Sequence, residues 1–256
     1  MSFLRDLPYS IVRRLPQPRN SATILAYHTI SDSHVYNAVS LRMFEQQMKM
    51  LREKRFNTVS LATLAVMREQ NKIPPKTVCV TLDDGFMDSY TSAFPVLMKF
   101  QIPASIFIET ANIGFESKNQ GAMFSMMGER ELKELHDSGL VSIESHTVHH
   151  PRITKISEEE VYHEVWEAKV YIERLLNKTC EHFAYPFGMH NESVRRATFK
   201  AGIRHAYTTQ EGLVRLGDDT MRLNRNNMNR TISLTQFESI CLWGRLSRTR
   251  FRQTFS

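Results

Sequence analysis

The sequence predicts an α/β fold in a single domain, and three observations lead to this prediction. Short apolar, β-branched runs alternate along the chain with amphipathic helical patterns. The length of 256 residues lies in the range that α/β barrels use for one domain. The chain has no internal repeat and no linker rich in Gly or Ser. A parallel sheet flanked by helices, either open or closed into a barrel, satisfies all three observations.

The expected strands are short runs rich in apolar, β-branched or aromatic side chains. In chain order they are 23–27, 56–59, 77–82, 104–108, 141–145, 182–185, 205–208 and 221–224. About eight strands in a chain of this length match the size of a barrel.

The expected helices lie between these strands, where apolar residues recur at i, i+3, i+4 and i+7 and so share one helix face. In chain order they are 41–54, 88–100, 129–138, 157–176 and 191–201. The fourth has a clear start, because Ser157 is an N-cap residue and three glutamates follow it where a helix prefers negative charge.

Residues 110–128 form the longest segment without a clear period. Loops of this length in compact domains are usually functional or disordered. The Phe and Met side chains of the segment could line a substrate groove or fold back onto the body. We favour the second interpretation.

The net charge of +6 belongs to the two ends of the chain. Residues 1–20 carry +3 and residues 244–256 carry +4, so the body at 21–243 is close to neutral. A nucleic-acid-binding domain would instead line one face or helix with basic side chains, so we expect no nucleic acid partner. The basic N-terminal segment and the basic C-terminal tail would suit an anionic membrane surface, but solvated termini fit the same charges.

Compartment signals favour a reducing environment. No stretch approaches the roughly 20 apolar residues of a membrane-spanning helix. The first 20 residues contain three prolines and no apolar core of signal-peptide length. Cys79, Cys180 and Cys241 are odd in number and lack paired spacing, which is typical of free thiols. These features predict a cytoplasmic protein, peripheral to the membrane if its basic ends bind there.

Two adjacent carboxylates, Asp83 and Asp84, follow the strand at 77–82 and precede Gly85. Neighbouring side chains in a strand point to opposite faces, so both can serve one site only if the chain turns there, which Gly85 permits. One carboxylate could then bind a cation while its neighbour takes a proton. Alone, the pair is equally typical of a helix cap followed by a turn.

Three histidines, His146, His149 and His150, follow the strand at 141–145. Imidazoles are common zinc ligands, and a pair spaced i, i+4 can converge on one ion. His146 has that spacing with His150 and the i, i+3 alternative with His149, and spacing does not decide between them. A solvated polar loop is the competing interpretation.

Asp84, His146 and His150 together would make a three-ligand site with an open position, which is typical of a catalytic rather than a structural zinc. Each lies at the C-terminal end of an expected strand, as do His28 and the Tyr-Pro-Phe-Gly run at 185–188. In a barrel, the active site is assembled from these ends.

Three ordered motifs resemble those of the polysaccharide deacetylase family, the NodB-homology enzymes of carbohydrate esterase family 4. They are TLDDG at 81–85, HTVHHP at 146–151 and FAYPFG at 183–188. The form of the third motif, together with the early Tyr27-His28 pair, is most similar to the branch that acts on exopolysaccharide and poly-N-acetylglucosamine.

The resemblance implies a distorted (β/α)7 barrel that removes acetyl groups, usually from N-acetylglucosamine units, with Zn²⁺ or another divalent transition metal. It implies that Asp83 is the general base. It also implies that Asp84, His146 and His150 bind the metal, which selects His150 over His149.

The third motif implies that the backbone N–H of Phe187, with Tyr185 nearby, contacts the oxyanion or the substrate. Two features depart from the family pattern. Many members have an Arg, which orients the base, where this chain has Ala184, and many have a Leu-x-His motif where the run at 221–226 has no histidine. The general acid is therefore open, and His28 is our candidate, with a buried structural histidine as the alternative.

The leading functional hypothesis is a metal-dependent N-deacetylase that acts on an N-acetylated glycan or glycan precursor. An O-acetyl esterase with the same site is the first alternative, because the same water and metal can attack either carbonyl. A non-catalytic glycan-binding protein that retained the fold is the second. The intact pair Asp83 and Asp84 argues against it.

Overall fold

The computed structural model describes residues 18–244. The basic ends expected at 1–20 and 244–256 lie almost entirely outside the described residues, so the membrane contact expected of them stays a prediction. No helix within 18–244 is long and apolar enough to cross a bilayer.

The main sheet contains nine strands in the described part of the chain. They are β1 (Ser21–Tyr27), β2 (Asn57–Thr58), β3 (Thr77–Leu82), β4 (Ala104–Ile108), β7 (Val141–Ser145), β8 (His182–Ala184), β9 (His205–Tyr207), β10 (Val214–Arg215) and β11 (Asn226–Asn227). Their order is β10-β1-β3-β4-β7-β8-β9, with β11 beside β1 and β2 beside β3. All neighbours are parallel except β10, which runs antiparallel to β1.

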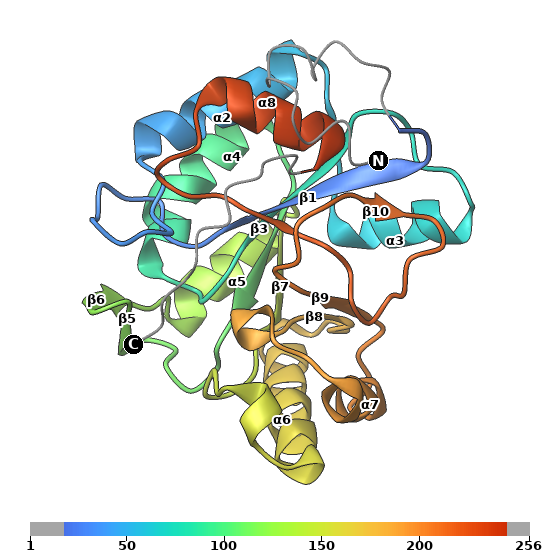
Figure 1. Cartoon of the computed structure of the whole chain (residues 1–256). Helices are drawn as coiled ribbons and strands as arrows, with labels where there is room; N and C mark the ends of the chain where they lie inside the picture. Colours follow the sequence, from blue (N-terminus) through green and yellow to red (C-terminus); the bar gives the residue numbers. More distant parts are fainter. Residues whose placement is uncertain (1–17, 245–256) are drawn as a thin grey trace.

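Helices connect and cover these strands (Figure 1). They are α2 (Leu41–Glu53), α3 (Leu61–Glu69), α4 (Phe94–Phe100), α5 (Glu129–Asp137), α6 (Glu158–Leu176), α7 (Glu192–Lys200) and α8 (Leu234–Trp243). A π-helical turn, η2 (Ser89–Ala93), precedes α4, and the 3-10 turns η3 (Ile153–Lys155) and η4 (Pro186–Gly188) follow β7 and β8. The start expected for α6 is confirmed, since Ser157 and Glu160 form a reciprocal capping box.

Two helices, α3 and α8, were not expected from the sequence. In α8 the consecutive residues 237–242 are all buried. A helix that is buried on most sides lacks the one-sided apolar stripe on which the sequence prediction depends.

The segment after Tyr207 links β9 to β1 across the distorted barrel that the resemblance implies. Leu223 makes a single parallel bridge to Tyr207 of β9, and three residues later Asn226 pairs with Leu25 of β1. The strand expected at 221–224 is therefore wrong in its extent. Between Leu223 and Asn226 the chain crosses from β9 to β1, so it pairs with each of these strands over only one or two residues.

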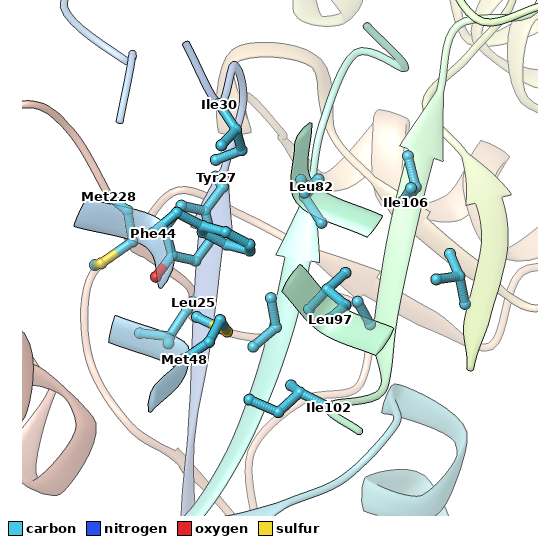
Figure 2. Close-up of a cluster of buried hydrophobic side chains, with 14 of the residues drawn as sticks. Leu25, Tyr27, Ile30, Phe44, Met48, Leu82, Leu97, Ile102, Ile106 and Met228 are labelled. Carbon is cyan, nitrogen blue, oxygen red and sulfur yellow. The ribbon is translucent and has the colours of Figure 1, made fainter. Parts of the chain in front are cut away.

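Side chains alternate between the two faces of the strands, and each face has its own core. Leu25, Tyr27 and Leu82 face outward and pack against Phe44 and Met48 of α2 (Figure 2). The inward set, which also meets α3, includes Ile24, Cys79, Phe107, Tyr207 and Leu223. Because both faces are covered by apolar groups, the strands read in the sequence as nearly continuous apolar runs.

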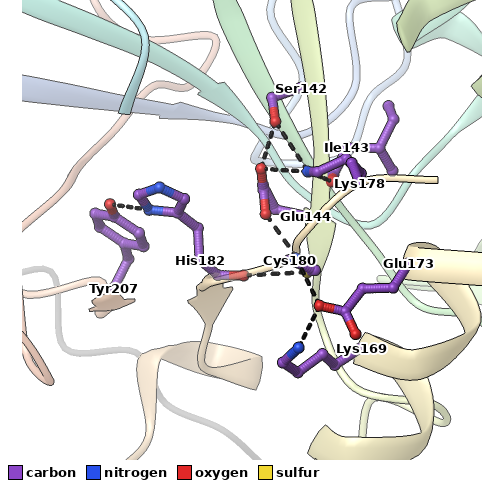
Figure 3. Close-up of polar contacts among 9 residues, drawn as sticks. All are labelled: Ser142, Ile143, Glu144, Lys169, Glu173, Lys178, Cys180, His182 and Tyr207. Carbon is purple, nitrogen blue, oxygen red and sulfur yellow. Dashed lines mark hydrogen bonds and ion pairs between the residues drawn. The ribbon is translucent and has the colours of Figure 1, made fainter. Parts of the chain in front are cut away.

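A buried polar cluster lies where β7, β8 and β9 meet (Figure 3). Glu144 accepts hydrogen bonds from Lys178, at 2.7 Å, and from Ser142. His182 Nδ1 lies 2.8 Å from the Tyr207 hydroxyl. The Glu144 carboxylate is thus paired and hydrogen-bonded, which buried charges require.

The segment 110–128 contains a hairpin of β5 (Glu116–Asn119) and β6 (Ala122–Ser125), which project from the body in Figure 1. Met126 and Met127 are buried, as expected of side chains that fold back onto the body. Phe115 and Met123 are exposed by 70% and 58%, contrary to that expectation. Strand pairing places Met123 on the outer face of the hairpin, where no described part of the chain covers it.

Candidate active site

Asp83 and Asp84 lie at a tight turn that directly follows β3. The Asp83 N–H donates to the Tyr27 carbonyl at 2.9 Å, so Asp83 continues the pairing with β1. Asp84 and Gly85 then adopt φ of 71° and 83°. A left-handed backbone is sterically costly for Asp84. The turn therefore begins at Asp84, one residue before the glycine that predicted it. Both carboxylates are buried at this turn.

Asp84, His146 and His150 form a candidate metal centre. One ligand atom from each lies within 4.8 Å of the others. Asp84 Oδ1 is 3.6 Å from His146 Nε2 and 3.8 Å from His150 Nε2. Two imidazole nitrogens and one carboxylate oxygen are a donor set that suits Zn²⁺ and related divalent ions.

The backbone of the third motif orients the first of these histidines. His146 Nδ1 lies 2.7 Å from the Ala184 carbonyl. Because a carbonyl only accepts, Nδ1 carries the proton and the lone pair of Nε2 faces Asp84.

His149 is turned away from the centre. Its Nδ1 lies 2.7 Å from Glu164 Oε1, and its side chain is 67% exposed. Glu164 also accepts the backbone N–H groups of Val148 and His149. This helix-borne carboxylate fixes the loop so that His150, with φ of 52°, points inward. The i, i+4 pair is therefore the one that the structure brings together.

The electrostatics of the centre fit a bound cation. Burial raises the pKa of Asp84 to about 7, and the charges of Asp83 and Glu109 add to the rise. Burial and the neighbouring His150 lower the pKa of His146 to about 3, and burial lowers that of His150. Neutral imidazoles are the form that binds metal, and a divalent ion would compensate the buried carboxylate charge.

Arg225 binds the neighbouring carboxylate, Asp83, and no sequence motif predicts this contact. Its two terminal nitrogens lie 2.7 Å from the two oxygens of Asp83, and its side chain is fully buried. Burial alone would raise the pKa of Asp83, but the charge and hydrogen bonds of Arg225 outweigh it and lower the pKa to about 2. Arg225 lies in the segment that closes the barrel. It is 142 positions from Asp83, so no pattern of neighbouring residues predicts the contact.

Two further side chains act on the charges of the aspartates, because His28 lowers the pKa of both and Glu109 raises the pKa of Asp84. His28 is half-buried and lies close enough to lower the pKa of both Asp83 and Asp84. Its Nδ1 is buried and has no hydrogen-bond partner within the described residues. Glu109 follows β4 directly and is 6% exposed. Its position at a strand end is the signal by which the sequence could have indicated it.

Phe187 of the third motif packs against the ring of His150. Phe187 adopts φ of 57°, its ring centroid is 4.6 Å from that of His150, and it is 49% exposed. Tyr185 is fully buried, and its hydroxyl donates to the Met221 carbonyl at 2.9 Å. Phe187 therefore borders the site. The Tyr185 side chain was expected to contact the substrate, but it is fully buried in the hydrophobic core.

The model of one family, described as polysaccharide deacetylase, matches residues 70–206. The chain belongs to the polysaccharide deacetylase family. It is accordingly a hydrolase of a family that depends on a metal, and the distorted barrel implied by the sequence motifs is confirmed.

Similar proteins are named as polysaccharide deacetylases. It is 29% identical to YxkH of Bacillus subtilis (strain 168) over 215 residues, which cover 84% of this chain and 74% of that protein. It is 27% identical to a poly-beta-1,6-N-acetyl-D-glucosamine N-deacetylase of Staphylococcus aureus (strain MSSA476), covering 79% of this chain and 77% of that one.

The solved structure of IcaB from Ammonifex degensii matches this deacetylase with a TM-score of 0.76 at 25% identity, covering 88% of this chain and 98% of that one. A polysaccharide deacetylase from Bacillus cereus matches with a TM-score of 0.75 at 27% identity, covering 87% of this chain and 69% of that one.

Proposed function

We propose that this deacetylase removes N-acetyl groups from β-linked N-acetylglucosamine in an exopolysaccharide or its precursor. One observation carries the proposal: a buried Asp84–His146–His150 triad lies directly beside a second carboxylate, Asp83, that is held ionised. The Staphylococcus aureus relative, named for poly-beta-1,6-N-acetyl-D-glucosamine, supports this substrate class.

A metal held by the triad would supply Lewis-acid polarisation of the acetyl carbonyl and would acidify the attacking water toward a pKa of about 7. Zn²⁺ is the ion that this donor set favours. The chain's own groups then move protons and hold charge around the acetyl carbon.

Asp83 acts as the general base. Each carboxylate oxygen has two acceptor positions, so Arg225 occupies one on each and leaves another free for a water proton. A pKa of about 2 keeps Asp83 ionised at any working pH but makes it a weak base. Its proton uptake therefore depends on the acidification of the water.

His28 acts as the general acid that protonates the leaving amine. Its charge lowers the pKa of both aspartates, and its buried Nδ1 has no hydrogen-bond partner in residues 18–244. The backbone N–H of Phe187 stabilises the oxyanion, a role suited to a rigid left-handed turn beside His150.

Acetate release tests the proposal. The purified chain is assayed on poly-β-1,6-N-acetylglucosamine oligomers and on an O-acetylated sugar, before and after chelation and after return of Zn²⁺. We expect zinc-dependent release from the N-acetylated oligomers. Release from the O-acetylated sugar alone would indicate the esterase alternative, and no metal-dependent release from either would contradict the enzyme.

Two neighbouring histidines provide matched variants for this assay. His150→Ala should abolish release and metal retention, because it removes a ligand from the triad. His149→Ala should retain both, because His149 contacts Glu164 instead. Equal losses in the two variants would contradict the assignment of the ligands.

A further inference from the structure

The two oxygens of Asp84 have different neighbours. Oδ1 faces the imidazole nitrogens of His146 and His150. Oδ2 accepts a hydrogen bond of 2.8 Å from the side-chain amide of Asn119 in the hairpin. The Asn119 amide therefore binds the Asp84 oxygen that does not face the two histidines.

The hairpin presents Asn119 to the site through its strand alternation. Ser117 pairs with Phe124 and Asn119 with Ala122, and these four residues are partly buried. The other face, which includes Lys118 and Met123, is exposed. Residues opposite each other across a strand pair share a face, so the hairpin has an inner and an outer surface.

Gln120 and Gly121 form the turn of the hairpin, with φ of 48° and 83°. Two consecutive positive φ values are typical of the two-residue type I′ turn, which sets the register of the flanking strands. Asn119 is the last residue before this turn. The turn therefore fixes which side chain reaches Asp84.

The base of the hairpin is attached to the chain that carries Asp84. The Phe124 ring stacks on Phe86 with centroids 4.4 Å apart, and the Met127 N–H donates to the Gly85 carbonyl. At the tip, the Gln120 side chain accepts the Tyr36 N–H at 3.1 Å. These attachments hold the hairpin against the site at both ends.

We infer that Asn119 is a positioning residue, which donates its amide to Asp84 Oδ2 and so presents Oδ1 to the metal as a single ligand atom. The inference rests on the metal centre of the proposed function. Hydrogen bonds to a ligating carboxylate fix its orientation, and their loss typically lowers metal affinity about 10- to 100-fold. The hairpin thereby couples its own docking to metal affinity.

Zinc affinity of the metal-free full chain, measured by competition with a chromophoric chelator, tests the inference without any glycan. Asn119→Ala should weaken Zn²⁺ binding about 10- to 100-fold. Lys118→Ala, on the outer face of the same strand, should leave it unchanged. Wild-type affinity in Asn119→Ala would overturn the inference.

Two further variants separate donation from other roles. Asn119→Leu keeps the side-chain volume but cannot donate, so its affinity should fall as in Asn119→Ala; wild-type affinity in Asn119→Leu would overturn the inference. Gln120→Ala removes the tip contact but keeps the amide, so it should weaken zinc less than Asn119→Ala. An equal loss would assign the effect to hairpin docking and overturn the role of the amide. If the wild-type chain releases no acetate while the zinc affinities of the variants change as expected, the result would count against the proposed function alone.

Discussion

Arg225 binds Asp83 with two parallel hydrogen bonds of 2.7 Å, and both side chains are buried. The residues are 142 positions apart in the chain. Many family members orient the base with an Arg in the third motif, where this chain has Ala184. Here the guanidinium that binds Asp83 comes from the barrel-closing segment, and the Ala184 carbonyl lies against His146 Nδ1.

Replacement of Arg225 should expose its effect on the base. In Arg225→Met the pKa of Asp83 should rise, because burial then acts without a compensating charge. The acid limb of the kcat/KM profile should move to higher pH, and stability should fall by about 3 to 5 kcal/mol because a buried carboxylate loses its partner.

Arg225→Lys keeps the charge but loses the two-pronged geometry, so it should recover much of the stability and only part of the activity. Arg222→Met is the matched control, since its side chain is 57% exposed and contacts Asp219 instead. An unchanged pH profile in Arg225→Met would refute the claim that Arg225 lowers the pKa of Asp83.

His28→Gln should distinguish an acid from a structural histidine. An amine leaves only after it is protonated, whereas the phenolate of p-nitrophenyl acetate leaves without a proton. We expect a loss of about 10²- to 10⁴-fold on the N-acetyl substrate and little loss on the activated ester. Equal losses on both substrates would indicate a structural role for His28.

Zinc affinity should depend on pH through Asp84. Its pKa is raised to about 7, so below that pH a proton competes with the metal, and affinity should fall about tenfold per pH unit. Above about pH 7 the carboxylate is ionised and the dependence should level off. His146, with its pKa lowered to about 3, stays neutral across this window. Chelator competition between about pH 5 and 8 measures the slope, and a flat line would contradict the role of Asp84.

The Lys178–Glu144 pair should matter for stability more than any surface pair. Lys178→Met would leave Glu144, which is 3% exposed, without its charged partner and should cost about 3 kcal/mol in urea unfolding. The double variant Lys178→Met/Glu144→Gln should recover part of that loss. Lys49→Ala, whose pair with Glu53 is exposed, should cost less than about 0.5 kcal/mol. Equal losses of stability in Lys178→Met and Lys49→Ala would refute the greater contribution of the buried pair.

Local patterns in the sequence were sufficient for most of the alternation of strands and helices, for a turn close to Gly85 and for the start of α6, because each depends on residues a few positions apart. The histidine cluster and the paired aspartates indicated a metal hydrolase, and three ordered motifs indicated its family. Sequence periodicity failed for the helices α3 and α8, of which α8 is buried on most sides. It also failed for the barrel-closing segment, which pairs with each neighbour too briefly to show a strand pattern.

The tertiary structure explains the choice of His150, which the motif resemblance had implied, and it alone revealed the roles of Arg225 and Asn119. His150 rather than His149 faces the centre because Glu164 holds the intervening loop. Arg225 reaches Asp83 because the sheet closes there, and Asn119 reaches Asp84 because a hairpin docks over the turn. The motifs thus specified the chemistry, whereas contacts between distant segments, which no local spacing encodes, determined the orientation and charge of the groups that perform it.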